Sequence, residues 1–208
     1  MSRIAILDYG MGNLRSVEKA LERVGADALV TNDPDRAAAA DGLVLPGVGA
    51  FPRAMELVRA RGFDALISDA VRRRVPVLGV CLGMQLLFER STELGGADGL
   101  GVLAGDVTGL EAPGLKLPHI GWEPVEWERE SELTDGIDSG TPFYFVHSFA
   151  PRPGNPGDVL GVATHGERFV CAVAHERVWG FQFHPEKSSA AGLHLYANFA
   201  GVCEPARA

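Results

Sequence analysis

A single cysteine stands between two glycines where a strand-like run gives way to helical spacing. Gly79, Cys81 and Gly83 form the pattern G-x-C-x-G within "GVCLGMQLLFE". Small residues on both sides of a nucleophile allow the sharp strand-to-helix turn that exposes it. A thiol at a helix N-terminus also faces the positive end of the peptide dipoles, which favours the thiolate. The pattern predicts a nucleophile, while a buried cysteine packed as a small hydrophobic residue is an equally good interpretation.

A histidine near the C-terminus can supply the base that such a thiol requires. His184 stands in "FQFHPEK", where Glu186 follows two residues later. Residues i and i+2 of extended backbone project to the same side, and Pro185 favours that conformation for His184. A carboxylate can therefore orient an imidazole that serves Cys81. The residues fill all three roles of a Cys–His–Glu triad, although His184 and Glu186 could equally be a surface pair.

The first half of the chain contains the elements that must position Cys81. Strand-like runs alternate with helical spacing, and the candidate strands are "RIAILDYG", "ADALVTN", "DGLVLPG" and "VPVLGV". We expect helices over about 14–24, capped by Asn13, over 51–74 with a break near Gly62, and over "GMQLLFER", with a small Ala-rich helix before "DGLVLPG". Alternating strands and helices predict a parallel sheet covered on both faces.

The second half has a different character and must position His184. After Gly95, short β-type runs are separated by glycine and proline clusters, and a helix is expected from about Ser188 to Val202. These runs predict antiparallel strands and hairpins added to the same sheet or beside it. We therefore expect an α/β fold with a mostly parallel central sheet flanked by helices, formed by one domain over residues 1–208.

Composition and charge exclude several classes of function. Hydrophobic residues make up 46% and charged residues 22% of the chain, and the net charge is −8. No nucleic-acid partner is expected, because only Arg72–Arg74 concentrates positive charge. No apolar run reaches the ~18 residues of a membrane span, and "MSRIAILDYG" has no signal-peptide pattern, so we expect the cytoplasm. Three cysteines without a CxxC pattern predict neither a disulfide framework nor a zinc ribbon.

Three other interpretations compete with the triad. "YGMGNLR" after the first strand suggests a nucleotide-binding loop, but the dinucleotide fingerprint requires glycine where Arg15 stands. Cys171 and His175 could bind a metal, yet no further ligands follow at suitable spacing. A free cysteine hydrolase, or a glyoxalase-like or chaperone-like protein, could share the sheet and the turn at Cys81. Such proteins are not expected to combine Gln85 with the "HPEK" segment.

The two segments together resemble a known family. "GVCLGMQLLFE" and "FQFHPEKSS" are similar to the class I glutamine amidotransferases, whose triad is Cys, His and Glu in that order. "DYGMGNLRSV", "LPGVGAF", "LPHIGW" and "YFVHSF" further resemble the glutaminase subunits of imidazole glycerol phosphate synthase. The resemblance extends from Asp8 to Ser189. Glu123 departs from it, because this family commonly has asparagine after the tryptophan of "HIGW".

The resemblance implies a reaction and roles for particular residues. Cys81 would attack the side-chain amide of L-glutamine, His184 would protonate the departing ammonia and then activate water, and Glu186 would hold the imidazole. The backbone N–H of Leu82, and that of Val48 or Gly49, would bind the oxyanion. Other residues would hold the amino-acid part of glutamine, namely Gly47, Gln85 and the Ser148–Phe149 backbone. No cofactor and no metal are implied.

The resemblance also implies a protein partner. Ammonia would pass to a separate (β/α)8-barrel cyclase subunit that makes imidazole glycerol phosphate and aminoimidazole carboxamide ribotide in histidine biosynthesis. Trp122, Tyr144 and Lys187 would face that subunit, although aromatic residues in β-type runs usually belong to a core. The glutaminase subunit of another class I amidotransferase complex is the alternative.

Overall fold

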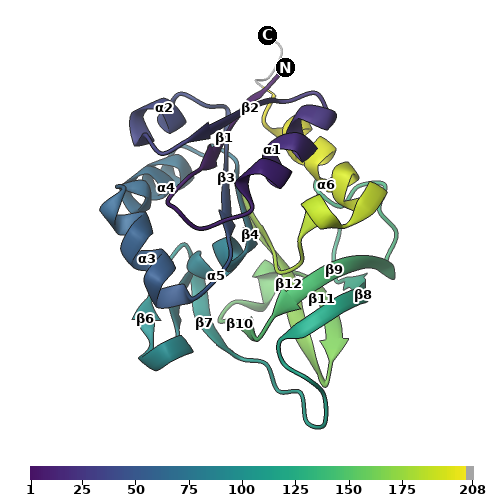
Figure 1. The fold of residues 1–208 in the computed structure, drawn as a ribbon. Coiled ribbons are helices and arrows are strands. Elements are labelled where there is room, and N and C mark those ends of the chain that lie inside the picture. The colour runs from purple at the N-terminus through teal and green to yellow at the C-terminus, as the bar shows by residue number, and fades with distance from the viewer. Residues whose placement is uncertain (205–208) are drawn as a thin grey trace.

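A nine-stranded sheet forms the centre of the computed structural model, which describes residues 1–204 (Figure 1). In spatial order its strands are β2 (Asp27–Thr31), β1 (Arg3–Leu7), β3 (Gly42–Gly47), β4 (Val77–Cys81), β13 (Val178–Phe181), β12 (Glu167–His175), β11 (Val159–His165), β8 (His119–Trp127) and β9 (Thr141–His147). The first five are parallel to one another and the rest continue the sheet antiparallel. The predicted α/β fold with a parallel centre is confirmed.

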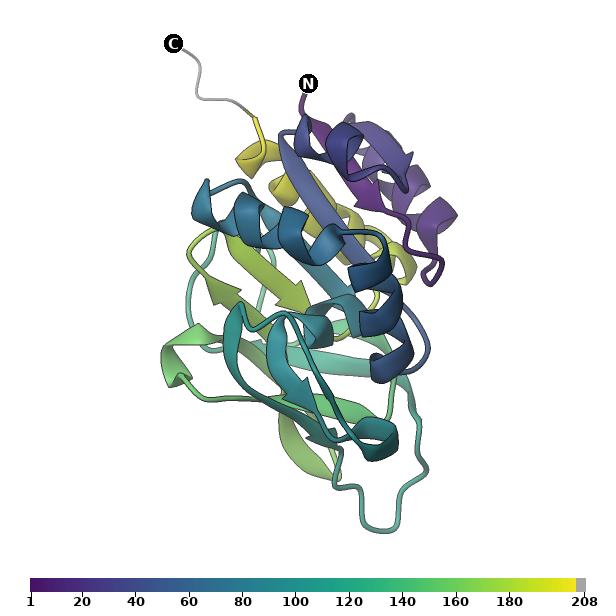
Figure 2. The ribbon, with the colours of Figure 1, turned by 90° about the vertical axis from the view of Figure 1, so that its left-hand side faces the viewer.

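Helices cover both faces of the parallel part, as Figure 2 shows. One face packs against α1 (Leu14–Arg23) and α6 (Ser189–Val202), and the other against α2 (Pro34–Ala38), α3 (Phe51–Ala60) and α4 (Phe63–Arg72). Alternate residues of β1 enter opposite cores, with Ile4 and Ile6 on the α1 side and Ala5 and Leu7 on the α3 side. Coverage on both faces explains why these strands are apolar without alternation.

The predicted break in the helical stretch 51–74 is confirmed. Between α3 and α4, Gly62 adopts the left-handed conformation with φ of 73°, which glycine accepts without steric cost. None of the helices within residues 1–204 combines the length and apolar character that a bilayer crossing requires.

A second, four-stranded sheet lies beside the first, in the order β10 (Phe149–Pro153), β7 (Leu103–Gly109), β5 (Phe88–Ser91) and β6 (Ala97–Asp98). Two sequence expectations are corrected here. The predicted helix over 83–90 is α5, which covers only Leu82–Leu86, because the chain enters β5 at Phe88. The run "TPFYFVHSFAP" divides at Ser148 into β9 and β10, which belong to different sheets. Within residues 1–204, three short 3-10 turns complete the elements, at Glu93–Gly95, Pro156–Asp158 and Pro185–Lys187.

Candidate active site

Cys81 stands at a sharp turn between β4 and α5. Its backbone has φ of 55° and ψ of −115°, a conformation that a residue with a Cβ adopts only when its surroundings enforce it. The flanking glycines make this possible, because a Cβ on Gly83 would lie 1.7 Å from the Leu45 carbonyl oxygen. A Cβ on Gly79 would lie 2.7 Å from Met84 Cα. The structure thus forms the turn predicted from G-x-C-x-G.

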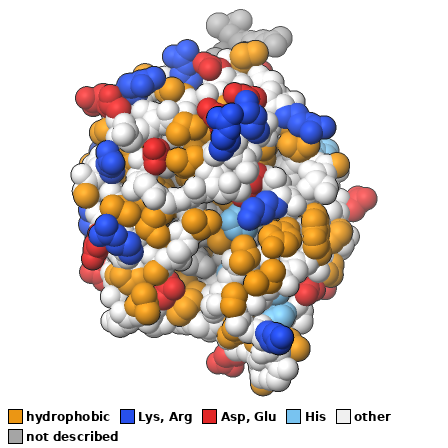
Figure 3. Space-filling view, viewed as in Figure 1, with side chains coloured by type: hydrophobic (Ala, Val, Ile, Leu, Met, Phe, Trp, Pro, Cys, Tyr) orange, Lys and Arg blue, Asp and Glu red, His pale blue; other side chains and the backbone are white. Residues whose placement is uncertain are grey.

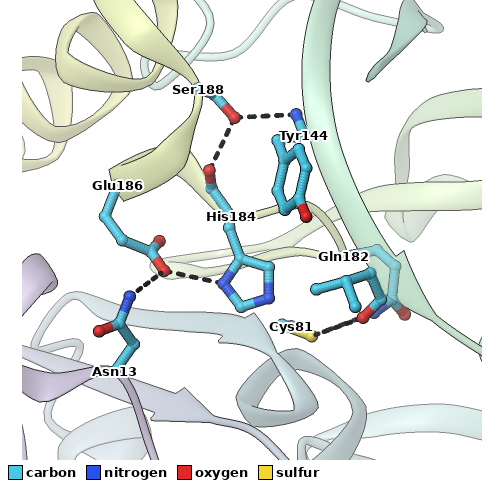
Figure 4. Close-up of polar contacts among 8 residues, drawn as sticks. Asn13, Cys81, Tyr144, Gln182, His184, Glu186 and Ser188 are labelled. Carbon is cyan, nitrogen blue, oxygen red and sulfur yellow. Dashed lines mark hydrogen bonds and ion pairs between the residues drawn. The ribbon is translucent and has the colours of Figure 1, made fainter. Parts of the chain in front are cut away.

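The sheet order brings His184 to Cys81. Strand β13 pairs in parallel with β4, with Phe181 opposite Val80, so the chain leaves β13 beside the turn at Cys81. His184 Nδ1 donates a hydrogen bond of 2.8 Å to Glu186 Oε1, and both side chains are only 1% exposed. Figure 4 shows the His184 ring between the Glu186 carboxylate and the Cys81 sulfur. The three residues singled out from sequence therefore lie together in the order Cys, His, Glu.

The charge state of His184 follows from these neighbours. Burial disfavours the charged imidazole, but interaction with the Cys81 and Glu186 side chains outweighs burial and raises the pKa of His184 to about 10. A protonated imidazole can donate its Nε2 hydrogen to a group that leaves from the site. The helix that follows Cys81, α5, has only five residues, so its macrodipole is weak.

Two residues that support the triad were not assigned this role from sequence. Asn13 Nδ2 donates to Glu186 Oε1 at 3.3 Å, and the Asn13 side chain makes no cap hydrogen bond to α1. The predicted helix cap is therefore wrong for the side chain, which instead reaches the triad. Ser188 Oγ donates to the His184 carbonyl at 2.7 Å and accepts from the Tyr144 N–H at 3.0 Å (Figure 4). Only tertiary structure joins these positions.

The sulfur of Cys81 also faces a buried amide network. Gln182 Nε2 lies 3.7 Å from Cys81 Sγ, and Gln182 is fully buried. Gln85 Nε2 donates to Gln182 Oε1 at 2.9 Å and to the Phe149 carbonyl at 3.0 Å. An amide nitrogen has two hydrogens, so both are used and only Gln85 Oε1 remains for a ligand. Gln182 had no signal in the sequence beyond its position two residues before His184.

A cavity of about 400 Å³ opens beside Cys81. It brings together most of the residues expected to bind substrate, and it is lined by Val48, Gly49, Cys81, Leu82, Gln85, Glu93, Pro118, Val146, His147, Ser148, Phe149, His184 and Lys187. Gly47 does not line it but lies buried opposite Cys81 in the β3–β4 pairing. A larger depression of about 940 Å³ is lined by residues 127–132 and 134–137, none of which is a predicted site residue. The 400 Å³ cavity is therefore the candidate substrate site.

The three residues expected to meet a partner lie together, and one of them, Lys187, lines this cavity. Trp122 is 49% exposed and meets the Tyr144 ring edge to face at 6.0 Å. Lys187 is exposed, and its Nζ lies 5.7 Å from the centre of the Tyr144 ring. Ile120 and Leu117 add exposed apolar area nearby, and Figure 3 shows hydrophobic side chains gathered on this side of a central hollow. An exposed Trp122 does not fit the alternative of a core aromatic.

Two sets of side chains carry the atom types of metal ligands. Cys171 is buried in the core, whereas His175 Nδ1 pairs with Asp158 Oδ1 at 2.9 Å, so this pair does not form a site. Within residues 1–204, His119, Glu123 and His165 offer ligand atoms within 4.8 Å of one another. The two imidazoles stack with 14° between their planes. Imidazole lone pairs lie in the ring plane, so those of stacked rings do not converge on one ion.

Residues 5–201 match the family model described as glutamine amidotransferase class-I. The chain therefore belongs to the class-I glutamine amidotransferase family. Among curated proteins, it is 48% identical over 199 residues to the imidazole glycerol phosphate synthase subunit HisH of Moorella thermoacetica, covering 96% of this chain and 94% of that protein. The same subunit of Bacillus cereus is 47% identical over 202 residues, covering 97% of this chain and 95% of that protein. Within the larger family, the chain is thus a member of the HisH group.

Solved structures share the fold at lower identity. A crystal structure of a glutamine amidotransferase superposes with a TM-score of 0.74 at 24% identity, covering 95% of this chain and 98% of that one. A structure of PurLQS from Thermotoga maritima gives a TM-score of 0.73 at 20% identity, covering 98% of this chain and 98% of the matched chain. These structures support the α/β architecture described above.

Proposed function

We propose that this chain, as the glutaminase subunit of imidazole glycerol phosphate synthase, hydrolyses L-glutamine to glutamate and ammonia with Cys81, His184 and Glu186. The observation that carries the proposal is the geometry of the triad. Cys81 stands on a strained turn against the cavity, and His184 is held by a buried Glu186 through a hydrogen bond of 2.8 Å. We further propose that residues 1–208 act as one amidotransferase domain in the cytoplasm.

The chemistry follows from these positions. The Cys81 thiolate attacks the side-chain amide carbon of glutamine, and the imidazolium of His184 protonates the departing nitrogen as ammonia leaves. A water molecule, deprotonated by His184, then hydrolyses the thioester to glutamate and regenerates Cys81. Glu186 keeps the ring oriented through Nδ1, so that Nε2 remains directed at the sulfur and the incoming water.

The cavity walls supply the remaining functions. The backbone N–H of Leu82 and that of Val48 or Gly49 are the proposed donors to the oxyanion, since these residues flank Cys81 in the cavity. Gln85 Oε1 and the Ser148–Phe149 backbone are the proposed contacts to the amino-acid part of glutamine. Gly47 acts indirectly, because a Cβ there would lie 2.9 Å from both Gly83 N and Leu82 Cβ. Glycine at this position allows the loop that carries Val48 and Gly49 to pack against the turn at Cys81.

A (β/α)8-barrel cyclase subunit is the proposed recipient of the ammonia. The patch formed by exposed Trp122 and half-buried Tyr144, with Lys187 beside it, has the composition of an interface centre. Because the patch adjoins the cavity, a partner bound there would receive ammonia without its release to solvent. The cyclase would then make imidazole glycerol phosphate and aminoimidazole carboxamide ribotide.

The test is an assay of glutamate release by the purified chain, alone and with the cyclase from the same genome. The proposal expects glutamine-dependent synthesis of imidazole glycerol phosphate only when both subunits are present. Matched mixtures with the synthase subunits of other class I amidotransferase complexes serve as controls. Activation by one of those subunits, and none by the cyclase, would refute the assignment of the partner.

A further inference from the structure

Two buried histidines form a series of hydrogen bonds that reaches the substrate cavity. His119 Nδ1 lies 3.0 Å from His147 Nε2, and His147 Nδ1 lies 2.9 Å from the Phe149 carbonyl oxygen. The residues are 1% and 6% exposed, respectively. Neither histidine belongs to the triad, and the reaction described above does not use them.

The positions of the hydrogens in these bonds follow from which atoms can donate and which can only accept. A carbonyl oxygen only accepts, so His147 Nδ1 must carry the hydrogen that it shares with Phe149. In a neutral imidazole the other nitrogen is then an acceptor, so His147 Nε2 receives its hydrogen from His119 Nδ1. Both rings are therefore neutral Nδ1–H tautomers, and His119 Nε2 is left without a hydrogen.

Burial supports this neutral state. It lowers the pKa of His147 to about 3, and burial together with the neighbouring His165 lowers the pKa of His119 to about 4. His119 Nε2 has no hydrogen-bond partner among residues 1–204. The partly exposed Glu123 carboxylate, 3.6 Å from this atom, favours a hydrogen there, but burial outweighs it and keeps the pKa of His119 at about 4. The His165 ring stacks on His119 with centroids 4.0 Å apart.

The Phe149 carbonyl, at the end of this series of hydrogen bonds, is part of the site. Phe149 follows the break at Ser148, where the backbone leaves β9 and enters β10 in the second sheet. Among the described residues, the pairing of β8 with β9 ends at His147. The Phe149 carbonyl instead receives two side-chain donors, His147 from one side and Gln85 from the other. Through Gln85 and Gln182 the connection continues to Cys81 Sγ.

We propose that His119 and His147 form a tautomer-locked relay that positions the Ser148–Phe149 backbone for binding of the amino-acid part of glutamine. His147 is the positioning residue that holds the carbonyl, and His119 fixes the tautomer of His147. The inference rests on the proposed function, because it assigns glutamine to the wall that the relay holds. The relay itself is a property of the free chain.

The first test needs no glutamine and therefore examines the relay even if the proposed function fails. Nitrogen-15 spectra of the histidine side chains, recorded between pH 6 and 8 and assigned with single His→Asn variants, report the hydrogen on each ring nitrogen. If the relay exists, both His119 and His147 will show a protonated Nδ1, a bare Nε2 and no titration. A protonated Nε2 on either ring, or titration of either ring in that range, would overturn it.

The second test separates positioning from simple packing. In the complex with the cyclase, His147→Leu removes the donor to Phe149, and we expect KM for glutamine to rise by about tenfold with a smaller change in kcat. His147→Asn keeps an N–H near the position of Nδ1 and should restore KM to within about threefold of the wild type. Equal KM values in the two variants, at equal thermal stability, would show that the ring only fills space.

Discussion

The two sides of the cavity are built in different ways. On the side of Cys81 the backbone is fixed by close packing of glycines between β3, β4 and α5, with contacts that no side chain could replace. On the side of Phe149 the backbone passes between two sheets, where the Ser148 carbonyl accepts from the Leu110 N–H at 2.9 Å and the Phe149 carbonyl accepts from side chains of α5 and β9. The first side presents a nucleophile on a rigid turn. The second presents a hydrogen-bonded wall beside an exposed apolar patch.

This difference suggests a division of work. A nucleophile must be held within a fraction of an ångström of its position, which backbone packing provides. A wall held by hydrogen bonds near a docking surface can change its position when a partner binds, at a cost of a few hydrogen bonds. Changes at Cys81 should therefore abolish chemistry or folding, whereas changes near Phe149 and Trp122 should alter binding and response to the partner.

The largest expected effect is the loss of the nucleophile. Cys81→Ala should lower glutamine hydrolysis by about 10⁴-fold or more, and thermal unfolding should remain nearly unchanged because a small thiol is replaced. His184→Ala should have a similar effect, and the double variant should be little worse than either alone, since triad members act as a unit. Steady-state assays with calorimetry of each variant check this. Near-normal turnover by folded Cys81→Ala would refute the nucleophile.

The next effect concerns the rigid turn. Gly83→Ala would place a Cβ 1.7 Å from the Leu45 carbonyl, and we expect the free energy of unfolding to fall by about 3 kcal/mol or more. Gly201→Ala is the matched control, because its Cβ would meet nothing within 4 Å in α6. The control should leave stability unchanged or raise it by up to about 1 kcal/mol. Similar urea midpoints for the two variants would contradict the account of the turn.

The exposed patch should show the opposite pattern. Trp122→Ala is expected to leave the stability of the free chain nearly unchanged and to weaken cyclase binding by about 30-fold, as for an interface hot spot. Tyr144→Ala and Lys187→Ala should also weaken binding or activation. Phe143→Ala, on the buried side of β9, should instead cost about 3–5 kcal/mol of stability. Calorimetry with a binding titration separates the two outcomes, and a large drop in the melting temperature of Trp122→Ala would place Trp122 in the core.

The smallest expected effect is at Asn13. Asn13→Ala removes one donor to Glu186 Oε1 and should lower kcat by about tenfold, while the stability of α1 is unaffected because the side chain makes no cap bond. Asp33→Ala is the contrasting variant, since Asp33 caps α2 through the N–H groups of Asp35 and Arg36. It should cost about 1 kcal/mol and leave kcat unchanged. A loss of stability in Asn13→Ala with unchanged kcat would show that Asn13 is a structural residue.

The elements and the triad were predictable because their signals are local or separated by a fixed spacing. G-x-C-x-G marks the turn by itself, and His184 and Glu186 lie two residues apart. The parallel strands are visible as apolar runs. The break between α3 and α4 was visible at Gly62, because a glycine there ends the helical pattern.

The missed features depend on contacts between distant segments. Asn13 meets Glu186 across 173 positions, and Gln182 meets Cys81 across 101 positions. The early end of α5 was missed because "LLFER" continues the helical spacing, and pairing of β5 with β7 overrides it. The division at Ser148 was hidden in the same way, since β9 and β10 form one continuous apolar run. Each of these features is determined by contacts or strand pairing between distant segments, which a single sequence does not display.

The central claim is that Cys81 is the nucleophile that attacks glutamine. The most direct measurement is the mass of the chain after exposure to an electrophilic glutamine analogue, followed by peptide mapping. We predict one adduct, on Cys81, which lines the cavity, with slower labelling in His184→Ala. We predict none on Cys171 and Cys203, which do not line it and whose thiol pKa is raised by burial. Full inhibition of glutamine hydrolysis with Cys81 unmodified, or an adduct on another cysteine that accounts for the inhibition, would contradict the claim.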